Sequence, residues 1–393
     1  MINGIEIFSG AGGLATGLGL SGVIHNAFVE WNANACNTLR QNYNNDIVFE
    51  GDIRKFDFSR YSGVDIIAGG PPCQPFSLGG KAKGNEDSRD MFPSAIRSIR
   101  ELMPKVFFFE NVKGLLRDGF REYLQYIVLQ LKYPTIANTF NDWRLHSQQI
   151  NKLSKHMPLD EAYDVSVNLI NAADYGVPQK RERVVIIGIR RDLDKSWELP
   201  RPTHSSDALL WDKYVTEDYW SRHNISPCNE VYATFPEKKK LLINTYGIFT
   251  PELKPWVTIR DALTNMPKEG DDTFYPNEHI IRDGAREYSG HTGSPIDEPS
   301  KTVKAGDHGV PGGENMIKFD NGKCRYFTIF EAKRIQTFPD EYQISGSWTE
   351  AMRQLGNAVP VRLANIISES LIKSVFYSDS KVCPVAHSEY VQY

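Results

Sequence analysis

Short apolar runs alternate with helical patterns over the first 190 residues of the chain. The runs that predict strands lie at 4–8, 26–30, 47–50, 64–68, 106–110, 164–170 and 184–189. Helical patterns fall between them, for example at 12–20, 32–43, 92–102 and 119–131. This alternation predicts an α/β fold, in which a doubly wound and mostly parallel sheet carries helices on both faces. A short, turn-rich link joins the last two strands, which could form an antiparallel pair at one edge.

The periodicity weakens after about residue 193, where Pro, Gly, Asp and Asn become frequent. A helical pattern returns near the C-terminus, at 358–376. The length of 393 residues also favours more than one domain. We therefore predict a catalytic domain made of residues 1–192 plus 345–393, and a second, irregular and β-rich domain at 193–344.

A polar stretch at 133–160 interrupts the first domain. Its histidines, His146 and His156, lie among Gln, Asn and Lys residues, so we expect them to be solvated rather than to bind a ligand. We interpret this stretch as an insertion without chemistry.

The composition argues against several classes of protein. No apolar stretch approaches the ~18 residues of a membrane span, and the N-terminus lacks the basic region of a secretory signal. The five cysteines are scattered, odd in number and without the spacing of metal ligands. We therefore expect reduced thiols, no metal ion, no membrane partner and a cytoplasmic location.

The charge balance gives little sign of a nucleic-acid partner. The net charge is −4, and residues 193–298 contain 12 Lys and Arg against 18 Asp and Glu. Domains that bind nucleic acid often have a strong basic excess. If this chain binds DNA, folding must gather its positive charges on one surface. One locally basic stretch does occur, at 180–191.

The run Gly69-Gly70-Pro71-Pro72-Cys73-Gln74-Pro75-Phe76-Ser77 follows the predicted strand at 64–68. Its glycines and prolines end the strand sharply, and chemistry in α/β sheets is placed where a strand opens into a loop. The prolines also fix the backbone on both sides of Cys73. A free cysteine is usually a small buried residue, but this rigid turn favours a reactive thiol.

Three further segments fit a nucleotide-like cofactor. Phe8-Ser9-Gly10-Ala11-Gly12-Gly13 joins the first strand to a helix, where glycines let the backbone approach a ligand and present helix amides to an anion. The phosphate loop of a dehydrogenase would look similar. Glu30 ends the second strand and could accept ribose hydroxyls, although an exposed acid fits this position equally well. Trp31 offers a flat face for an adenine, and Asp52 a further acceptor.

Two charged segments could form the rest of a site. Phe107-Phe108-Phe109-Glu110 predicts a buried strand that ends in a carboxylate, and an adjacent strand would bring Glu110 close to Cys73. Arg181 and Arg183 precede the next strand, and the alternation of side chains puts both on one face. A solvated charge run is the commoner origin of such a cluster. Gln354–Pro360 is interpreted as the start of the last helix.

These motifs resemble, in order and approximate spacing, those of the C5-cytosine methyltransferase family, from Phe8 to about Ile367. The resemblance implies a Rossmann-like catalytic domain that uses S-adenosylmethionine, and a DNA-recognition domain. It implies the catalytic residues Cys73, Glu110, Arg181 and Arg183. The cofactor residues that it implies are Phe8, Ser9, Gly10, Gly12, Gly13, Glu30, Trp31, Asp52, Ile53, Pro72, Met91, Asn357 and Ala358. Residues 297–303 resemble the segment that supports the recognition domain. One departure is Glu6, where Asp is common.

The resemblance also implies a mechanism. The Cys73 thiolate adds to C6 of a cytosine, while Glu110 donates a hydrogen bond or proton to N3 and Arg183 holds O2. C5 then attacks the methyl group, and loss of the C5 proton expels Cys73. Because C6 is inaccessible in a duplex, the base must be flipped out. We expect Ser77–Asp90 to act as a mobile lid and residues 193–296 to read the DNA sequence.

Three other interpretations remain. A tRNA cytosine-5 methyltransferase has the same fold, but such enzymes usually carry Cys-Phe-Thr where this chain has Ile248-Phe249-Thr250, which favours duplex DNA. A nucleotide-dependent dehydrogenase would explain only the glycine loop. An inactive regulatory homologue would be expected to lack Cys73 or Glu110. By family analogy we expect a monomeric, bacterial restriction-modification enzyme, which shares its site with a cognate endonuclease but forms no stable complex with it.

Overall fold

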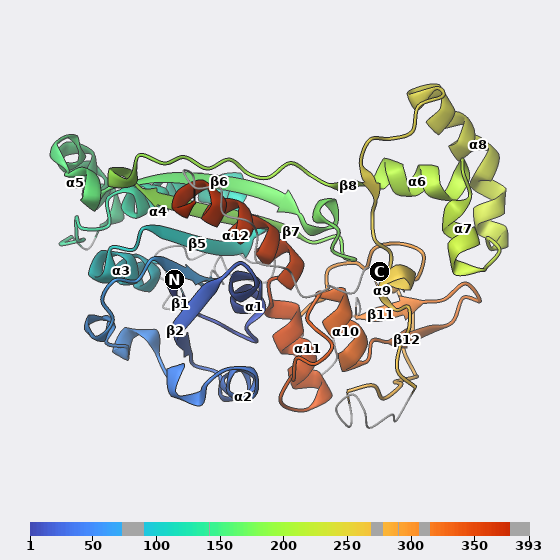
Figure 1. The fold of residues 1–393 in the computed structure, drawn as a ribbon, viewed down its shortest axis with the longest axis horizontal. Coiled ribbons are helices and arrows are strands. Elements are labelled where there is room, and N and C mark those ends of the chain that lie inside the picture. Colours follow the sequence, from blue (N-terminus) through green and yellow to red (C-terminus); the bar gives the residue numbers. More distant parts are fainter. Residues whose placement is uncertain (73–89, 141, 269–277, 290, 306–314, 378–393) are drawn as a thin grey trace.

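A seven-stranded sheet forms the centre of the computed structural model (Figure 1), which describes residues 1–72, 90–140, 142–268, 278–289, 291–305 and 315–377. Its strands are β1 (Ile2–Ile7), β2 (Val23–Glu30), β3 (Val48–Glu50), β4 (Ile66–Gly69), β5 (Val106–Val112), β6 (Tyr163–Asn171) and β7 (Glu182–Arg190). The order is β3-β2-β1-β4-β5-β7-β6. The first five strands are parallel, whereas β7 runs antiparallel to both β5 and β6. The predicted sheet and its antiparallel edge pair are confirmed.

Helices cover both faces of this sheet. They are α1 (Gly13–Leu20), α2 (Ala33–Asn42), α3 (Phe92–Leu102), α4 (Arg121–Lys132) and α12 (Val361–Phe376). The sequence of β5 is continuously apolar because both faces of this strand are buried. Phe107 and Phe109 enter one core with α3 and α4, while Phe108 enters the other core with α1 and α12. A strand buried on both faces has no polar side to alternate with.

The polar stretch at 133–160 contains one helix, α5 (Trp143–Leu153). His146 is buried and bonds through Nδ1 to the Tyr126 hydroxyl at 2.8 Å and through Nε2 to the Ile136 carbonyl at 3.0 Å. The expectation of a solvated His146 is therefore wrong, because the helix turns this side chain onto α4. Burial lowers its pKa. His156 is exposed, as expected.

The second region is more helical than expected. Its helices are α6 (Ser206–Tyr214), α7 (Asp218–His223), α8 (Asn229–Tyr246), α9 (Ile259–Ala262) and α10 (Ile329–Ile335), and α11 (Trp348–Asn357) follows them. Its strands are β8 (His204–Ser205), β9 (Lys254–Pro255), β10 (Ser294–Pro295), β11 (Met316–Lys318) and β12 (Cys324–Tyr326). Small sheets are present, but α8 alone has 18 residues whereas these strands have two or three. This corrects the expectation of a β-rich domain.

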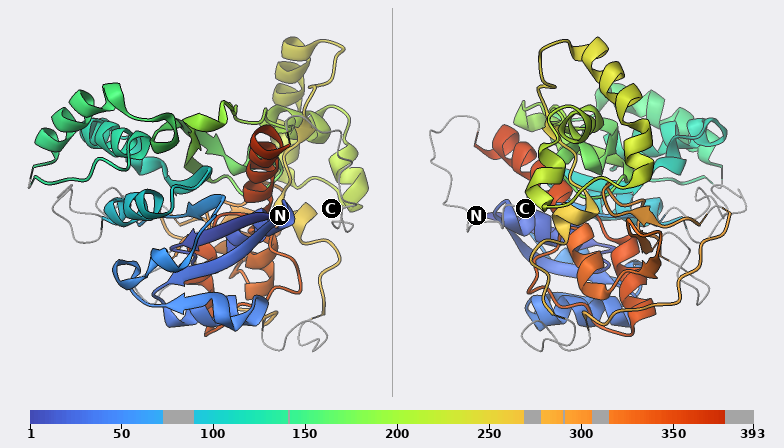
Figure 2. Two further views of the ribbon diagram at one scale, coloured as in Figure 1. Left: turned by 60° about the vertical axis from the view of Figure 1, so that its left-hand side comes forward. Right: turned by 90° about the vertical axis from the view of Figure 1, so that its right-hand side faces the viewer.

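Helices α6, α7 and α8 stand apart from the central sheet (Figures 1 and 2) and are here called the helical unit, residues 204–258 with β8 and β9. The unit has two small apolar cores, one around Leu209, Tyr219 and Trp220 and one around Trp211, Tyr214 and Leu242. No helix in the described part of the chain has the length and apolar character needed to cross a membrane.

A third large core lies beneath the helical unit. It joins residues of α9, α10 and α11 to Ala11 in the first loop of the chain. Tyr342 and Ile344 lie before the expected domain boundary and Ala351 and Leu355 after it, yet all four belong to this one core. The region after the helical unit is thus packed continuously with the catalytic end of the chain.

Candidate active site

The carboxyl ends of β1, β2, β4 and β5 lie along one edge of the sheet, because these strands are parallel. The register pairs Ile7 with both Val29 and Gly69, and Gly69 with Phe109. The next residue on each strand is Glu30 on β2, Phe8 after β1, Gly70 after β4 and Glu110 on β5. These four residues therefore lie in a row along this edge of the sheet, in the order of the strands.

The loop after β1 has an unusual backbone. Phe8 has φ 54°, Gly10 φ 53° and Gly12 φ 78°, all in the left-handed region that suits glycine. A methyl group added at Gly10 would meet no atom within 4 Å, so this position opens onto free space. At Gly13 an added Cβ would lie 2.2 Å from the Val359 carbonyl oxygen. Glycine is needed there because the link between α11 and α12 presses against the loop.

Glu30 is fixed by three backbone amides. Its Oε2 accepts a hydrogen bond from the Gly10 amide at 2.8 Å, and its Oε1 accepts from the amides of Trp31 and Asn32 at 2.9 and 2.8 Å. The carboxylate is buried, whereas the Trp31 side chain is 81% exposed. Glu30 therefore joins the first loop to the end of β2, and an uncovered indole ring stands beside it.

The segment after β3 lies next to Glu30, because the Gly51 amide donates to the Glu30 carbonyl at 2.8 Å. Ile53 is buried there. The Asp52 carboxylate binds the Arg54 guanidinium, which lowers the pKa of Asp52 to about 2. Asp52 is thus a charged acceptor at this end of the site.

Cys73 lies outside the described residues, as does most of the predicted lid at 77–90. The residues before it are held in place. The Asn111 side chain donates to the Pro71 carbonyl at 2.9 Å, and the Met91 amide donates to the Pro72 carbonyl at 3.2 Å. The sequence interpretation gave Asn111 no role. The position of Asn111 directly after Glu110 was the only feature of the sequence that could have suggested such a role.

Glu110 and Arg183 form a buried ion pair. The Arg183 Nε lies 2.6 Å from Glu110 Oε1, and both side chains are nearly covered. The antiparallel register explains the contact, since it pairs Arg183 with Val112, two residues beyond Glu110. Burial lowers the pKa of Arg183, and Glu110 opposes this change. A Cβ added at Gly70 would lie 3.6 Å from Glu110 Oε2, so the start of the Pro-Pro-Cys turn borders this pair.

Arg181 occupies a different place from the one predicted. Its side chain is fully buried, and its guanidinium donates to the carbonyls of Val303, Gly356 and Ala358 at 3.1, 2.8 and 3.0 Å. It precedes β7, so strand alternation does not keep it on the same side as Arg183. The expectation that Arg181 lines the pocket is corrected: it binds backbone groups.

The segment expected to begin the last helix instead ends the one before it. Asn357 is the last residue of α11, and α12 begins at Val361 after Pro360. The intervening link contains Ala358, which is buried, while Asn357 is exposed. This link contacts Gly13 as described above, so Ala358 lies against the first loop.

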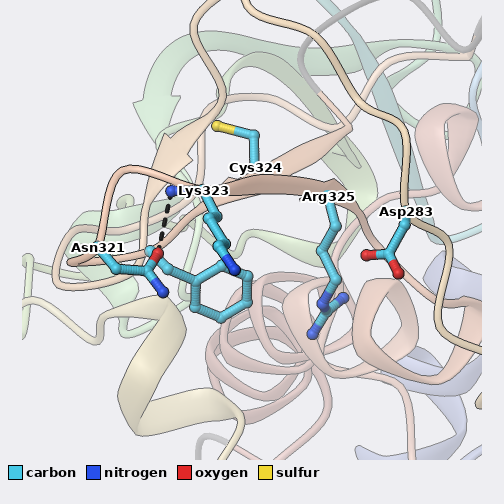
Figure 3. Close-up of a pocket in the computed structure, with 6 residues that line it drawn as sticks. Asp283, Asn321, Lys323, Cys324 and Arg325 are labelled. Atoms are coloured by element: carbon cyan, nitrogen blue, oxygen red, sulfur yellow. Dashed lines mark hydrogen bonds between the residues drawn. The ribbon is translucent and has the colours of Figure 1, made fainter.

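A separate shallow hollow lies on the β11–β12 hairpin (Figure 3). It is lined by Asp283, Phe319, Asn321, Lys323, Cys324 and Arg325. The Arg325 guanidinium binds Glu331 through two hydrogen bonds, and the Cys324 thiol donates to Glu287 at 2.9 Å. The pKa of Cys324 is raised to about 11 by burial and by Glu287. A raised pKa disfavours the thiolate form of Cys324 near neutral pH.

The comparisons with known proteins agree with this geometry. The model of the C-5 cytosine-specific DNA methylase family matches residues 2–133 and 141–373. The type II methyltransferase M.PspPI of Psychrobacter sp. is 34% identical over 383 residues, 94% of this chain and 78% of the relative. M.NgoMIV of Neisseria gonorrhoeae is 29% identical and covers 94% of this chain and 97% of its own.

Solved structures are similar in fold. The Dnmt2 methyltransferase of S. pombe has a TM-score of 0.58 and 14% identity, and covers 96% of this chain and 100% of its own. The methyltransferase EhMeth of Entamoeba histolytica has a TM-score of 0.54 and 15% identity, and covers 97% and 99%. These structures are too low in sequence identity to show more than the fold. The family model, however, matches nearly all of the sequence, and the chain belongs to the C-5 cytosine-specific DNA methylase family.

Proposed function

We propose that this protein transfers a methyl group from S-adenosylmethionine to C5 of a cytosine that is flipped out of duplex DNA. The observation that carries the proposal is the meeting of two motifs at one sheet edge. The Asn111 side chain holds the carbonyl of Pro71, and the neighbouring Glu110 forms a buried ion pair with Arg183. A nucleophile turn and an acid with its arginine are what covalent activation of cytosine requires.

The residues around the first loop fit the cofactor. S-adenosylmethionine supplies an electrophilic methyl group on a sulfonium sulfur. The open backbone at Gly10 leaves room for its amino-acid part, and Glu30 has lone pairs that remain available for ribose hydroxyls. The exposed ring of Trp31 suits a purine face. Phe8, Ser9, Gly12, Gly13, Asp52, Ile53, Pro72, Met91, Asn357 and Ala358 complete the proposed cofactor site.

Cys73 is the proposed nucleophile. Its thiolate adds to C6, and Glu110, in its protonated form, donates a hydrogen bond or proton to N3 so that negative charge is not left on the ring. Arg183, which contacts Glu110, holds O2. Expulsion of Cys73 after loss of the C5 proton restores the aromatic ring. Each group acts only on a base outside the helix, so base flipping precedes chemistry.

The helical unit is the proposed reader of DNA sequence. It has its own cores and stands apart from the sheet, and it falls within residues 193–296, which carry no proposed catalytic group. We propose this unit, rather than all of 193–344, as the recognition domain, because buried residues of α9, α10 and the segment at 338–344 share a core with α11. The relatives are named type II methyltransferases. This supports a restriction-modification role, in which a cognate endonuclease acts on the same sequence. We propose that the protein works as a monomer.

Methylation of a random DNA library, followed by bisulfite sequencing, tests this proposal. We expect 5-methylcytosine at one short sequence. Parallel reactions with tRNA transcripts address the alternative that Ile248-Phe249-Thr250 disfavours. Methyl transfer to tRNA but not to DNA, or to neither, would overturn the proposed function.

A further inference from the structure

The two prolines before Cys73 are held from two sides. On one side, the Asn111 side chain donates to the Pro71 carbonyl, as described above. On the other side, the Met91 amide donates to the Pro72 carbonyl at 3.2 Å. That carbonyl belongs to the peptide group that joins Pro72 to Cys73. The position of Met91 therefore bears directly on the position of the proposed nucleophile.

The Asp90 side chain fixes the chain around Met91. Its Oδ1 accepts a hydrogen bond from the Phe92 amide at 3.1 Å, at the start of α3. Its Oδ2 accepts from the Tyr123 hydroxyl, on α4. Bonds to a carboxylate are stronger than bonds to a neutral acceptor. One side chain thus joins the start of α3 to α4, and Met91 lies between the two residues that it holds.

The stretch at 133–160 packs behind Tyr123. Helix α5 lies against α4 (Figure 1). Trp143 and His146 are three residues apart on α5, so they share one face of the helix. The Trp143 ring meets the Tyr123 ring nearly edge-on, with centroids 6.0 Å apart, and lies 5.4 Å from the Tyr126 ring. The aromatic face of α5 therefore supports the face of α4 that carries Tyr123.

The same stretch also fixes Tyr126, the neighbour of Tyr123 on α4. Burial lowers the pKa of His146, which favours the neutral ring. His146 Nε2 lies 3.0 Å from the Ile136 carbonyl, which only accepts, so Nε2 carries the proton and Nδ1 accepts from the Tyr126 hydroxyl at 2.8 Å. The Asn138 amide donates to that hydroxyl oxygen at 3.4 Å. Tyr126 in turn packs against Tyr123, with ring centroids 5.9 Å apart.

We propose that Asp90 and Tyr123 are positioning residues for the proposed nucleophile, and that the stretch at 133–160 supports them. This inference rests on the proposed function, since it concerns how Cys73 is aimed at C6 of cytosine. It gives a role to a stretch that the sequence pattern alone left without one. A misplacement of about 1 Å can slow an oriented reaction about 100-fold, so loss of one hydroxyl at this point should be visible in the rate.

Tyr123→Phe in the full-length protein removes the hydroxyl and keeps the ring. The substrate is a duplex that carries the sequence methylated by the wild type. We expect the single-turnover rate at saturating DNA and cofactor to fall at least about five-fold, while the DNA concentration that gives half the maximal rate changes less than about two-fold. A purely structural hydroxyl would leave the saturating rate unchanged. A rate within about two-fold of the wild type would overturn the proposal.

Tyr163→Phe is the matched control. Tyr163 is buried in the same core, and its hydroxyl donates to the Pro104 carbonyl at 2.6 Å, before β5 begins. This variant should also lose stability in urea but keep the wild-type rate. An equal fall in rate in Tyr163→Phe and Tyr123→Phe would reduce the effect to a general loss of stability and overturn the proposal.

Asp90→Asn is a second variant, which keeps the test decisive if Tyr123→Phe does not fold. The amide oxygen can still accept from the Phe92 amide, but the bond to the Tyr123 hydroxyl loses its charged acceptor. We expect the saturating rate to fall at least about three-fold. A normal rate in this variant would contradict a positioning role for Asp90.

Hydrogen exchange without DNA separates this inference from the proposed function. The Met91 amide should exchange faster in Tyr123→Phe than in the wild type or in Tyr163→Phe, because its bond to the Pro72 carbonyl opens more often. Trp143→Leu, which removes the ring behind Tyr123, should have the same effect. These results would support the inference even if the wild type methylates no DNA. Unchanged exchange at Met91 in either variant would overturn it.

Discussion

The strand-end site and the helical unit are built in different ways. The site is made by four parallel strands whose ends must coincide, and its polar groups are buried against large cores. The helical unit has two small cores, and its Lys213 and Tyr219 side chains make polar contacts with Asp297 and Glu298. The unit can therefore vary in sequence while the site stays rigid.

This difference separates chemistry from specificity. A change at the strand-end site should alter rates by orders of magnitude and leave the methylated sequence unchanged. A change in the helical unit should alter which sequence is methylated and leave the covalent chemistry intact. The predictions below test this separation.

Cys73→Ser should produce the largest effect. Removal of a covalent nucleophile costs roughly 10⁴- to 10⁶-fold in kcat, so methyl transfer should be undetectable in ordinary assays. Binding of S-adenosylmethionine should stay within a few-fold of the wild type. A duplex with 5-fluorocytosine should trap the wild type covalently and leave the Ser variant free. Trapping of the variant, or no trapping of the wild type, would contradict the assignment.

Glu110→Gln should lower kcat about 100-fold or more, the range of general acid–base groups, with little change in KM for the cofactor. The reason is that Glu110 acts on N3 only as charge develops. Steady-state kinetics with varied cofactor measure both constants.

Glu30→Ala is the matched comparison, because Glu30 ends another strand of the same sheet but contacts the first loop. It should raise the cofactor KM and change kcat little. The same kinetic phenotype in both variants would show that Glu110 and Glu30 do not have the separate roles proposed, in catalysis and in cofactor binding.

Replacing residues 204–258 with the corresponding segment of a relative of known specificity should move the methylated sequence. Each specific base contact contributes about 1–3 kcal/mol, so the preference between the two sequences should change by at least about 10-fold. Bisulfite sequencing of library DNA measures it. A folded, active chimera that still methylates the original sequence would place recognition outside the helical unit.

The sequence alone predicted the parts of the fold that depend on local pattern. The three consecutive phenylalanines at 107–109 predicted a strand that is buried on both faces. The end of this apolar run drew attention to Glu110. Parallel strand ends then brought the motifs together, as expected. The contact of Glu110 with Arg183 was not predicted, because it depends on β7 pairing with β5, which the sequence pattern did not reveal.

The errors share a physical cause, which is long-range contact. Arg181 looks like Arg183 in the sequence, but partners more than 100 residues away draw it into the interior. His146 is buried by α4, which no local signal reveals. In α8, Pro236 lies inside the helix and interrupts the pattern that would have predicted it. The helical unit was therefore the part least visible in the sequence.

The smallest predicted effect concerns the stability of the junction between the two regions. His204, on β8, is buried beside Arg362 and Lys254, and burial first and these cations second lower its pKa to about 4. An unfolded histidine has a pKa near 6.5, so the unfolded state binds the extra proton between these values. The stabilising contribution is complete above about pH 6.5 and is lost as the pH falls towards 4. His204→Gln carries no proton, so its free energy of unfolding in urea should fall less over this range. His156→Gln, at an exposed position, is the control and should follow the wild type. Equal acid sensitivity in His204→Gln and wild type would show that this junction does not depend on a neutral histidine.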